Sequence, residues 1–469
     1  MEARTALAEA SLLAESGVRF LAAYRFWIVA AVWVGVRAYA VWGLQPDYFV
    51  ARYFEMAGDW LDGFTPYAAF KVEYPPGALV LMVLPRIFTE APIVYGYLFA
   101  FMMLLADLAI LLCLDRMAAL VFGSQIHGDT VRRYKSTLLG LIYVLFTAFF
   151  GRLLFQHDDL IVALLLTAVI YAALRKKTAV VDVLLAVGIW LNLTALVWLP
   201  LLWWYGFVGR DEPLSSKRIL KISEFMRALL PRVAVLAGSL AVLFLPFILL
   251  AGRSLAYMVQ FHLARGTQLE STAAGILMMA AKIFGVELST EFTHHSMHLS
   301  GELGSQGAVV SAILSIIVFV VLTIYLARRM YDQREASARD GLLIRGLPAV
   351  ILALLATSKV FMPQYLVWIA PLAALLALDD HPRYREVGWR LFAVNLLSVV
   401  LFYFYYPDLR ELHFLPGVLL LVRNVLVIWS VISLLVPDKP AAERREPVWH
   451  IPARVRKYLT YVPVVLVFA

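Results

Sequence analysis

The chain has 469 residues, of which 62% are hydrophobic and only 16% are charged. A water-soluble domain of this length needs far more polar surface, so the composition predicts an all-α polytopic membrane protein; the alternating strands of a membrane barrel are not seen. The net charge of +8 does not indicate nucleic-acid binding, because the basic residues cluster between apolar stretches as cytoplasmic loops do. The one cysteine, Cys113, lies within an apolar stretch, which excludes a disulfide framework and a thiolate metal site.

Apolar stretches of about 20 residues have the length that a membrane-spanning helix needs. About twelve transmembrane helices are predicted, near residues 21–44, 92–114, 137–155, 159–174, 178–193, 195–209, 233–252, 306–327, 346–358, 364–379, 390–405 and 417–436. Basic clusters between them are expected in the cytoplasm, at residues 132–135, 175–177, 210–232, 328–345 and 383–385. The mixed or acidic segments 45–91, 253–305 and 406–416 are then expected outside, and residues 1–18 as an amphipathic helix on the inner surface.

The first outer loop is predicted to hold two juxtamembrane helices that do not cross the bilayer. Residues 47–64 place charged and apolar side chains on opposite faces, as in a helix that lies in the membrane plane. The sequence YPPG (74–77) opens a second helix, in which prolines are tolerated because first-turn N–H groups lack intrahelical partners. A crossing by residues 75–88 would put the basic segment 115–136 outside, so this helix is predicted not to span.

Asp47 follows the first predicted span directly, at the expected boundary between membrane and water. One interpretation is a helix N-cap, because aspartate is favoured there and an amphipathic helix follows. The other is a general base that takes a proton from an acceptor hydroxyl held at this depth by its lipid. The two roles are compatible, since one carboxylate oxygen can cap while the other accepts a proton.

Charged residues also surround the start of the YPPG helix. Lys71 and Glu73 precede it, and Tyr74 begins the motif itself. The partial positive charge and free N–H groups of a helix N-terminus, together with Lys71, would suit a phosphate. The alternative is a snorkelling lysine that pairs with Glu73 at the lipid headgroups.

The stretch FQHDDL (155–160) joins two predicted spans on the outer side. His157, Asp158 and Asp159 would there bind a divalent metal or position an acceptor. Adjacent carboxylates point in different directions on a helix, which weakens a metal site built from this stretch alone. The alternative is local capping of the following helix.

The large outer loop carries polar side chains spaced three or four apart: His262, Arg265, Gln268 and Ser271. This spacing predicts one face of a helix. A cation, a titratable ring and amide or hydroxyl groups suit an oxyanion such as a phosphodiester, and the alternative is a solvated helix face. The nearby THHSMH (293–298) has irregularly spaced histidines and is predicted to be a solvated loop.

Lys359 stands at the outer end of a predicted span, and Pro363 separates it from an apolar helix that begins with Gln364 and Tyr365. A charge at membrane depth is rare and usually faces a cavity, whereas a lysine near the boundary can also snorkel. Lys359 therefore predicts a second anion-binding position. Since the candidates come from separate segments at one expected depth, they are predicted to converge on one site.

Three stretches, taken in this order, resemble the GT-C glycosyltransferases, and glycosyltransferase family 87 in particular: DYFVARYFEMAGDWLDGFTPYAAFKVEYPPGAL (47–79), HLARGTQLEST (262–272) and TSKVFMPQYLVWIAPL (357–372). That family includes polyprenyl-phosphate-mannose-dependent mannosyltransferases. The resemblance implies one GT-C-type transmembrane domain over residues 1–436, whose outer loops 45–91 and 253–305 roof the site. It leaves 437–469 as a basic cytoplasmic tail.

The resemblance also implies roles for single residues. The first-loop aspartate of the family is the base, which corresponds to Asp47. The lysine-and-glutamine patch corresponds to Lys359 and Gln364, and the arginine-containing loop to Arg265. Thr194 stands where relatives often carry a lysine, so any phosphate contact of that lysine would have to come from elsewhere here.

The expected function is transfer of a sugar, most simply mannose, from a polyprenyl-phosphate donor to a lipid-linked or glycolipid acceptor, with inversion. Donor-phosphate binding is assigned to Lys359, Arg265, His262, Gln268 and Lys71. Substrate binding is assigned to Tyr74, Glu73, His157, Asp158, Gln364 and Tyr365. The protein is expected to be a monomer in the bacterial plasma membrane with its site facing outside and no required cofactor, although a divalent metal is compatible. The alternatives are a lipid-linked sugar flippase or transporter, and a non-catalytic assembly subunit.

Overall fold

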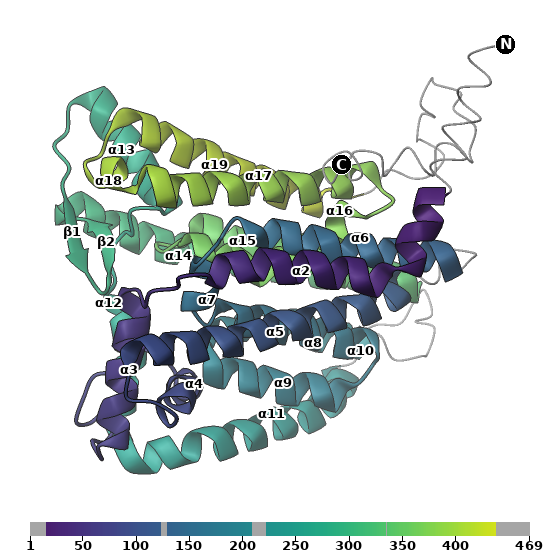
Figure 1. Ribbon diagram of the computed structural model, residues 1–469, viewed down its shortest axis with the longest axis horizontal. Coiled ribbons are helices and arrows are strands. Elements are labelled where there is room, and N and C mark those ends of the chain that lie inside the picture. The colour runs from purple at the N-terminus through teal and green to yellow at the C-terminus, as the bar shows by residue number, and fades with distance from the viewer. Residues whose placement is uncertain (1–15, 123–128, 209–221, 334, 438–469) are drawn as a thin grey trace.

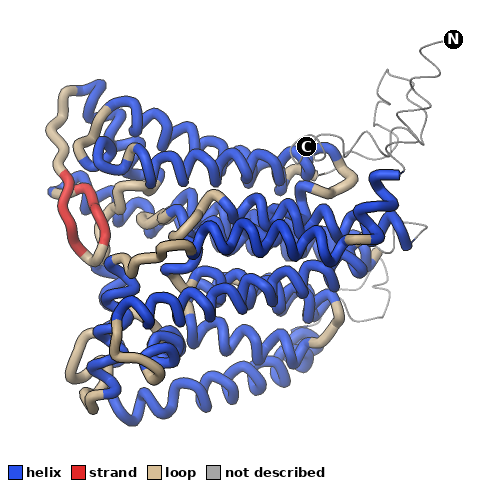
Figure 2. Tube along the Cα trace, in the orientation of Figure 1, coloured by secondary structure: helices blue, strands red, loops and turns tan. Residues whose placement is uncertain are grey.

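The computed structural model describes residues 16–122, 129–208, 222–333 and 335–437. Within them the chain is almost entirely helical, and the long helices run side by side in one bundle (Figure 1). The predicted outer loops 45–91 and 253–305 gather at one end of this bundle, together with a short pair of strands (Figure 2). We refer to this end as the hairpin end. The predicted surface helix over 1–18 and the predicted tail over 437–469 fall almost wholly outside the described residues.

The helices before the strands are α2 (Arg25–Val41), α3 (Tyr48–Leu61), α4 (Pro76–Arg86), α5 (Pro92–Val121), α6 (Asp129–Ala148), α7 (Leu153–Gln156), α8 (Asp159–Leu174), α9 (Thr178–Leu191), η1 (Leu193–Val197), α10 (Leu199–Val208), α11 (Ile222–Ala251), η2 (Gly252–Ala256), α12 (Tyr257–Ala264) and α13 (Thr272–Phe284). The strands are β1 (Thr290–Thr293) and β2 (Ser296–Leu299). After them come α14 (Gly301–Asp332), α15 (Ala336–Thr357), η3 (Pro363–Ile369), α16 (Ala370–Ala377), α17 (Pro382–Phe404), α18 (Tyr406–Arg410) and α19 (Phe414–Leu435).

Six helical segments of the described chain are long and apolar enough to cross a membrane: α5, the continuous run Met226–Ala264, α14, α15, α17 and α19. A seventh span results if Ser16–Ala23 and Arg25–Val41, which meet at a bend of 74°, are counted as one. The protein is therefore a polytopic helical membrane protein, as the composition predicts. The count of twelve is not confirmed, because several predicted spans are helices of 16 residues or fewer, among them α8 and α9.

The two helices predicted within residues 45–91 are present as α3 and α4. Helix α3 buries Val50, Tyr53 and Ala57, the apolar face that the sequence predicts. Helix α4 has 11 residues, which at 1.5 Å per residue gives about 16 Å and cannot cross a bilayer. Gly77 lets α4 approach α9, since a Cβ at this position would lie 2.6 Å from the Trp190 ring.

A β-hairpin replaces the solvated loop predicted at 293–298. Strands β1 and β2 pair antiparallel, with Thr293 opposite Ser296. The two turn residues, His294 and His295, have φ of 46° and 60°, as a type I′ turn requires. The hairpin carries none of the Asn-Gly or Asp-Gly signals that normally mark such a turn, so the prediction was wrong here. Ser296, Met297 and His298 are buried.

The single helical face predicted for residues 262–271 is also wrong. Helix α12 ends at Ala264, and α13 begins only after Ser271, whose hydroxyl caps it by accepting a bond from Ala274 N at 3.1 Å. The segment between them is held instead by the hairpin, because Leu269 N donates to Met297 O at 2.9 Å. His262 and Gln268 therefore lie on different structural elements.

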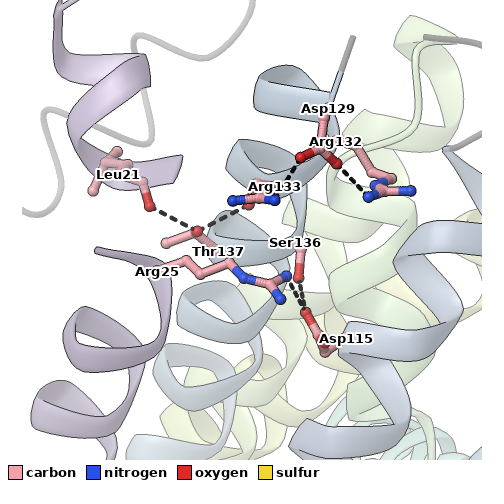
Figure 3. A network of polar contacts seen from close by, with 8 residues as sticks. All are labelled: Leu21, Arg25, Asp115, Asp129, Arg132, Arg133, Ser136 and Thr137. Carbon is pink, nitrogen blue, oxygen red and sulfur yellow. Dashed lines mark hydrogen bonds and ion pairs between the residues drawn. The ribbon is translucent and has the colours of Figure 1, made fainter. Parts of the chain in front are cut away.

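The opposite end of the bundle is rich in ion pairs (Figure 3). Asp115 of α5 accepts from Arg25 at 2.8 Å and from Ser136, which joins α5 to α2 and α6. Asp129 pairs with Arg132 and, at 2.6 Å, with Arg133. The basic cluster predicted at 132–135 as an inter-span segment is thus part of α6.

Two buried ion pairs join helices within the membrane part of the bundle. Arg37 of α2 donates through Nε to Asp107 of α5 at 2.7 Å, and both side chains are almost fully buried. Arg232 of α11 binds Asp182 of α9 through two nitrogens, at 3.0 and 2.8 Å. Buried charges are costly unless paired, so these pairs fix which helices lie together.

Candidate active site

A cavity of about 440 Å³ lies at the hairpin end. It is bounded by the segment before α4, the junction of α7 and α8, η1, the end of α12, the hairpin turn and the start of η3. Nine residues predicted for the site line it: Glu73, Tyr74, His157, Asp158, His262, Arg265, Lys359, Gln364 and Tyr365. Segments almost 300 positions apart in the chain thus converge on one cavity. Three other residues predicted for the site do not line the cavity: Asp47, Lys71 and Gln268.

Asp47 caps α3 and lies next to a residue of the cavity wall. Its Oδ1 accepts a bond from Val50 N at 2.9 Å, so the capping interpretation is confirmed. Its Oδ2 lies 3.9 Å from Nε2 of His157, whose ring lines the cavity and packs on Phe49. Burial raises the pKa of Asp47 above its ordinary value and lowers the pKa of His157 to about 4. Asp47 is therefore separated from the cavity by a neutral imidazole, and its role as a base stays a prediction.

Two cations form one wall of the cavity. Nζ of Lys359 donates to Leu263 O at 2.8 Å, and Nη2 of Arg265 donates to Ser296 Oγ at 2.9 Å. In the described parts of the chain neither has a carboxylate within 4.0 Å, and Arg265 Nε is buried without a hydrogen-bond partner. Burial, and then the nearby Arg265, lower the pKa of Lys359. Two neighbouring cations without counter-charges are suited to an anion.

Carboxylates occupy another wall. Asp158 and Asp159 both line the cavity. Asp158 is the N-cap residue of α8, yet within the described structure its side chain makes no capping bond, and Asp159 accepts from Trp368 Nε1 at 2.6 Å. The capping interpretation of this stretch is therefore wrong. Burial raises the pKa of Asp158 to about 6, so its carboxyl can take up and release a proton near neutral pH.

The same wall continues into η3. Gln364 is 4% exposed, and its Oε1 finds no hydrogen-bond partner in the described residues. Tyr365 stacks on Trp368 with ring centroids 4.5 Å apart. Trp368 is itself buried in the protein. An unpaired amide oxygen beside stacked aromatic rings offers a surface for hydroxyl-rich rings.

The start of α4 offers little geometric support for the predicted phosphate site. Pro75 and Pro76 have no N–H groups, and Ala78 N already donates to Pro75 O at 3.1 Å. Lys71 lies outside the cavity with its ammonium 5.5 Å from the centroid of the Tyr257 ring. This helix end therefore offers few hydrogen-bond donors to a phosphate.

The predicted Lys71–Glu73 pair is also wrong. Glu73 is buried and accepts two bonds from Arg52 of α3, at 2.9 and 2.8 Å. His295 of the hairpin turn approaches the same carboxylate at 3.6 Å and shares a 2.8 Å hydrogen bond with the Tyr48 hydroxyl. Glu73 therefore ties α3 and the hairpin to the cavity wall.

The cavity extends between apolar side chains on its other side: Leu191, Leu193, Val197, Ile351, Leu354 and Leu355. They come from the α9–η1 break and from α15. Thr194 also lines this part and donates its hydroxyl to Asn192 at 2.6 Å, so it supplies no cation. We call this part the apolar arm.

Sequence reasoning missed several lining residues, chiefly His294, His295 and Asn192. The irregular spacing of the histidines gave no helical or strand period, and the hairpin that presents them depends on contacts with distant segments. Asn192 follows α9 and caps η1, because its side chain accepts a bond from Thr194 N, a local signal that could have been found.

The arrangement offers no clear metal site. Within the parts of the chain that the structure describes, no group of three or more His, Cys, Asp or Glu side chains is arranged to hold a metal ion. The metal hypothesis for His157, Asp158 and Asp159 has no support from this geometry.

No protein-family model matches the chain, and no curated protein matches it.

Proposed function

We propose that this protein is a GT-C-type membrane glycosyltransferase that takes its sugar from a polyprenyl-phosphate donor. The observation that carries the proposal is the composition of the cavity. Two cations and the carboxyl of Asp158, which have no ion-pair partners among the described residues, share one space of about 440 Å³ with the apolar arm at the hairpin end. A sugar linked through phosphate to a long apolar chain matches each of these features. Its phosphate suits the cations, its hydroxyl groups suit the carboxyl, and its apolar chain suits the apolar arm.

The donor phosphate is placed between Arg265 and Lys359, with the first isoprene units along the apolar arm. During transfer the bond between the anomeric carbon and the phosphate oxygen breaks, and its electron pair stays on the phosphate. Cations aimed at that oxygen stabilise the developing charge, an effect worth several kcal/mol in a site that excludes water. The Thr194 substitution is then harmless, because Arg265 supplies the cation.

The acceptor hydroxyl attacks the anomeric carbon from the face opposite the phosphate, so the configuration inverts. Its proton passes to a carboxylate, for which we retain Asp47, while Asp158 holds the hydroxyl. Asp47 does not line the cavity, and its Oδ2 lies 3.9 Å from Nε2 of the lining residue His157. This position does not exclude the role, because catalytic hydrogen bonds often tighten only when substrate is bound. We further propose that the sugar is mannose, that the acceptor is a glycolipid, and that the reaction takes place at the outer face of the plasma membrane.

A lipid-linked sugar flippase is the second candidate. It is favoured by the helix breaks at η1 and η3, which border the cavity, since transporters bind anions at the ends of broken helices.

The test uses purified full-length protein in proteoliposomes with a doubly labelled polyprenyl-phosphate mannose. Release of polyprenyl phosphate supports the enzyme, whereas movement of the intact donor across the bilayer without cleavage supports the flippase.

Single variants test the assigned roles in the same assay. Asp47→Asn should lower turnover by about 10²–10⁴-fold, the usual contribution of a general base. Asp62→Asn is the matched control, because Asp62 is exposed at the far end of the same helix. Near-normal turnover of Asp47→Asn would reject Asp47 as the base. Lys359→Met should weaken donor binding, and Lys282→Met, at an exposed lysine of α13, should not.

A further inference from the structure

Gln268 connects the segment between α12 and α13 to the segment between α15 and η3. Its backbone N donates to Lys359 O at 2.8 Å, and its side-chain Oε1 accepts from Phe361 N at 2.9 Å. The second segment, residues 358–362, joins α15 to η3 and carries Lys359. Gln268 is fully buried, so both bonds are shielded from water. One glutamine therefore holds the backbone of Lys359, a cavity cation, and of the residue two positions after it.

The orientation of the Gln268 amide is fixed by Glu270. Phe361 N can only donate, so the amide oxygen must face it and the NH₂ group must point the other way. There Nε2 donates to Glu270 Oε2 at 2.7 Å. Glu270 is buried, and burial raises the pKa of its carboxyl to about 7. Whether charged or neutral, the Glu270 carboxyl keeps an oxygen that can accept the hydrogen bond from the Gln268 amide.

Arg423 of α19 braces both ends of this arrangement. Its Nη2 donates to the backbone oxygen of Glu270, and its guanidinium lies 4.0 Å from the centroid of the Phe361 ring. The side chain is completely buried, and Nη2 also donates to Asn424 at 2.8 Å. A membrane helix thus anchors the segment that carries the cavity cation.

Gln268, Glu270 and Arg423 do not line the cavity, whereas Lys359 does. We infer that Gln268 and Glu270 are positioning residues that act through Lys359, holding its ammonium where the phosphate of a lipid ligand binds. The inference rests on the proposed phosphate role of Lys359 and goes beyond it, because it replaces direct phosphate binding by Gln268 with an indirect role. Binding groups must be held to about 0.5 Å to be effective, which a five-residue connection cannot achieve alone.

A double-mutant cycle separates this role from a merely structural one. Full-length protein in detergent is titrated with a short-chain polyprenyl monophosphate, and each variant is first checked for folding by gel filtration and thermal unfolding. Lys359→Met should weaken binding about tenfold, the size of one charge-assisted hydrogen bond. Gln268→Met should weaken it by a similar factor, while in the Lys359→Met background it should cause no further loss.

The control is Gln306→Met, since Gln306 bonds only Glu302 on the exposed side of α14 among the described contacts. Glu270→Leu should reproduce the loss, and Glu270→Gln should restore binding because it keeps an acceptor oxygen. If Gln268→Met does not fold, Gln268→Asn replaces it, because the shorter amide cannot span both partners.

Independent, additive losses from Gln268→Met and Lys359→Met would overturn the inference, as would unchanged binding by Gln268→Met. In either case the phosphate role of Lys359 survives. Unchanged binding by Lys359→Met would instead reject that role, and with it both the phosphate assignment and the positioning inference.

Discussion

Replacing Asp107 by asparagine should destabilise the protein strongly. The carboxylate of Asp107 is fully buried and accepts from Trp33 at 2.6 Å, from Arg37 at 2.7 and 3.3 Å and from Tyr143 at 2.6 Å. In Asp107→Asn the Arg37 guanidinium loses its counter-charge, and an amide NH₂ faces a donor. Breaking a buried ion pair on one side costs about 3–5 kcal/mol. We expect that loss in the free energy of unfolding, measured in mixed micelles by tryptophan fluorescence.

The surface pair of the same helix is the matched control. Asp115 lies 2.8 Å from Arg25, and both side chains are more than 40% exposed. Exposed pairs contribute about 0–1 kcal/mol, so Asp115→Asn should change little. Adding Arg37→Met to Asp107→Asn should recover part of the loss, since the unpaired charge is then gone. Equal stability of Asp107→Asn and the natural protein, or a further loss in the double variant, would refute this reasoning.

Three other predictions follow from the site and its supports. Gly77→Ala should lower the free energy of unfolding by about 1–3 kcal/mol, because the new Cβ would overlap Trp190. Gly35→Ala, on an open face of α2, should be tolerated in the same unfolding assay. Turnover should fall as the pH drops through about 6, because Asp158 then becomes protonated. Asp158→Asn should remove this acid limb of the pH–rate profile. An unchanged limb would exclude Asp158 as its source. The Glu270 carboxyl keeps its proton in the folded protein up to about pH 7 but loses it near 4.5 when unfolded, so stability should decline as the pH rises between these values. Glu270→Gln should flatten that decline, and an equally steep one would assign it to other groups.

The features that sequence reasoning recovered have local signals. The YPPG prolines mark a helix start, charge alternation between spans excludes a crossing at 75–88, and the two-faced pattern of 47–64 appears as α3. Lys359 was found because charge is rare at membrane depth, and Arg265 because it is a cation in a row of evenly spaced polar side chains. These signals belong to a few neighbouring residues and survive folding.

The features that were missed depend on contacts between distant segments. Gln268 has the spacing of a helical face, yet its partners are Lys359 and Phe361, more than 90 positions away. The His294–His295 turn is held by a hydrogen bond to Tyr48 rather than by turn-forming residues. Periodicity carries no information about such partners, so the roles of these residues could not be predicted from one sequence.

The unequal lengths of the helices have a consequence for access. Helices α8 and α9, with 16 and 14 residues, rise about 24 and 21 Å, whereas a hydrocarbon core is about 30 Å thick and α14, with 32 residues, rises about 48 Å. In a bilayer that α14 crosses fully, helices as short as α8 and α9 would not reach both surfaces, and a hollow at their ends would lie below the headgroups. A ligand that diffuses within the plane of the bilayer arrives already at that level, while a water-borne one must first descend to it.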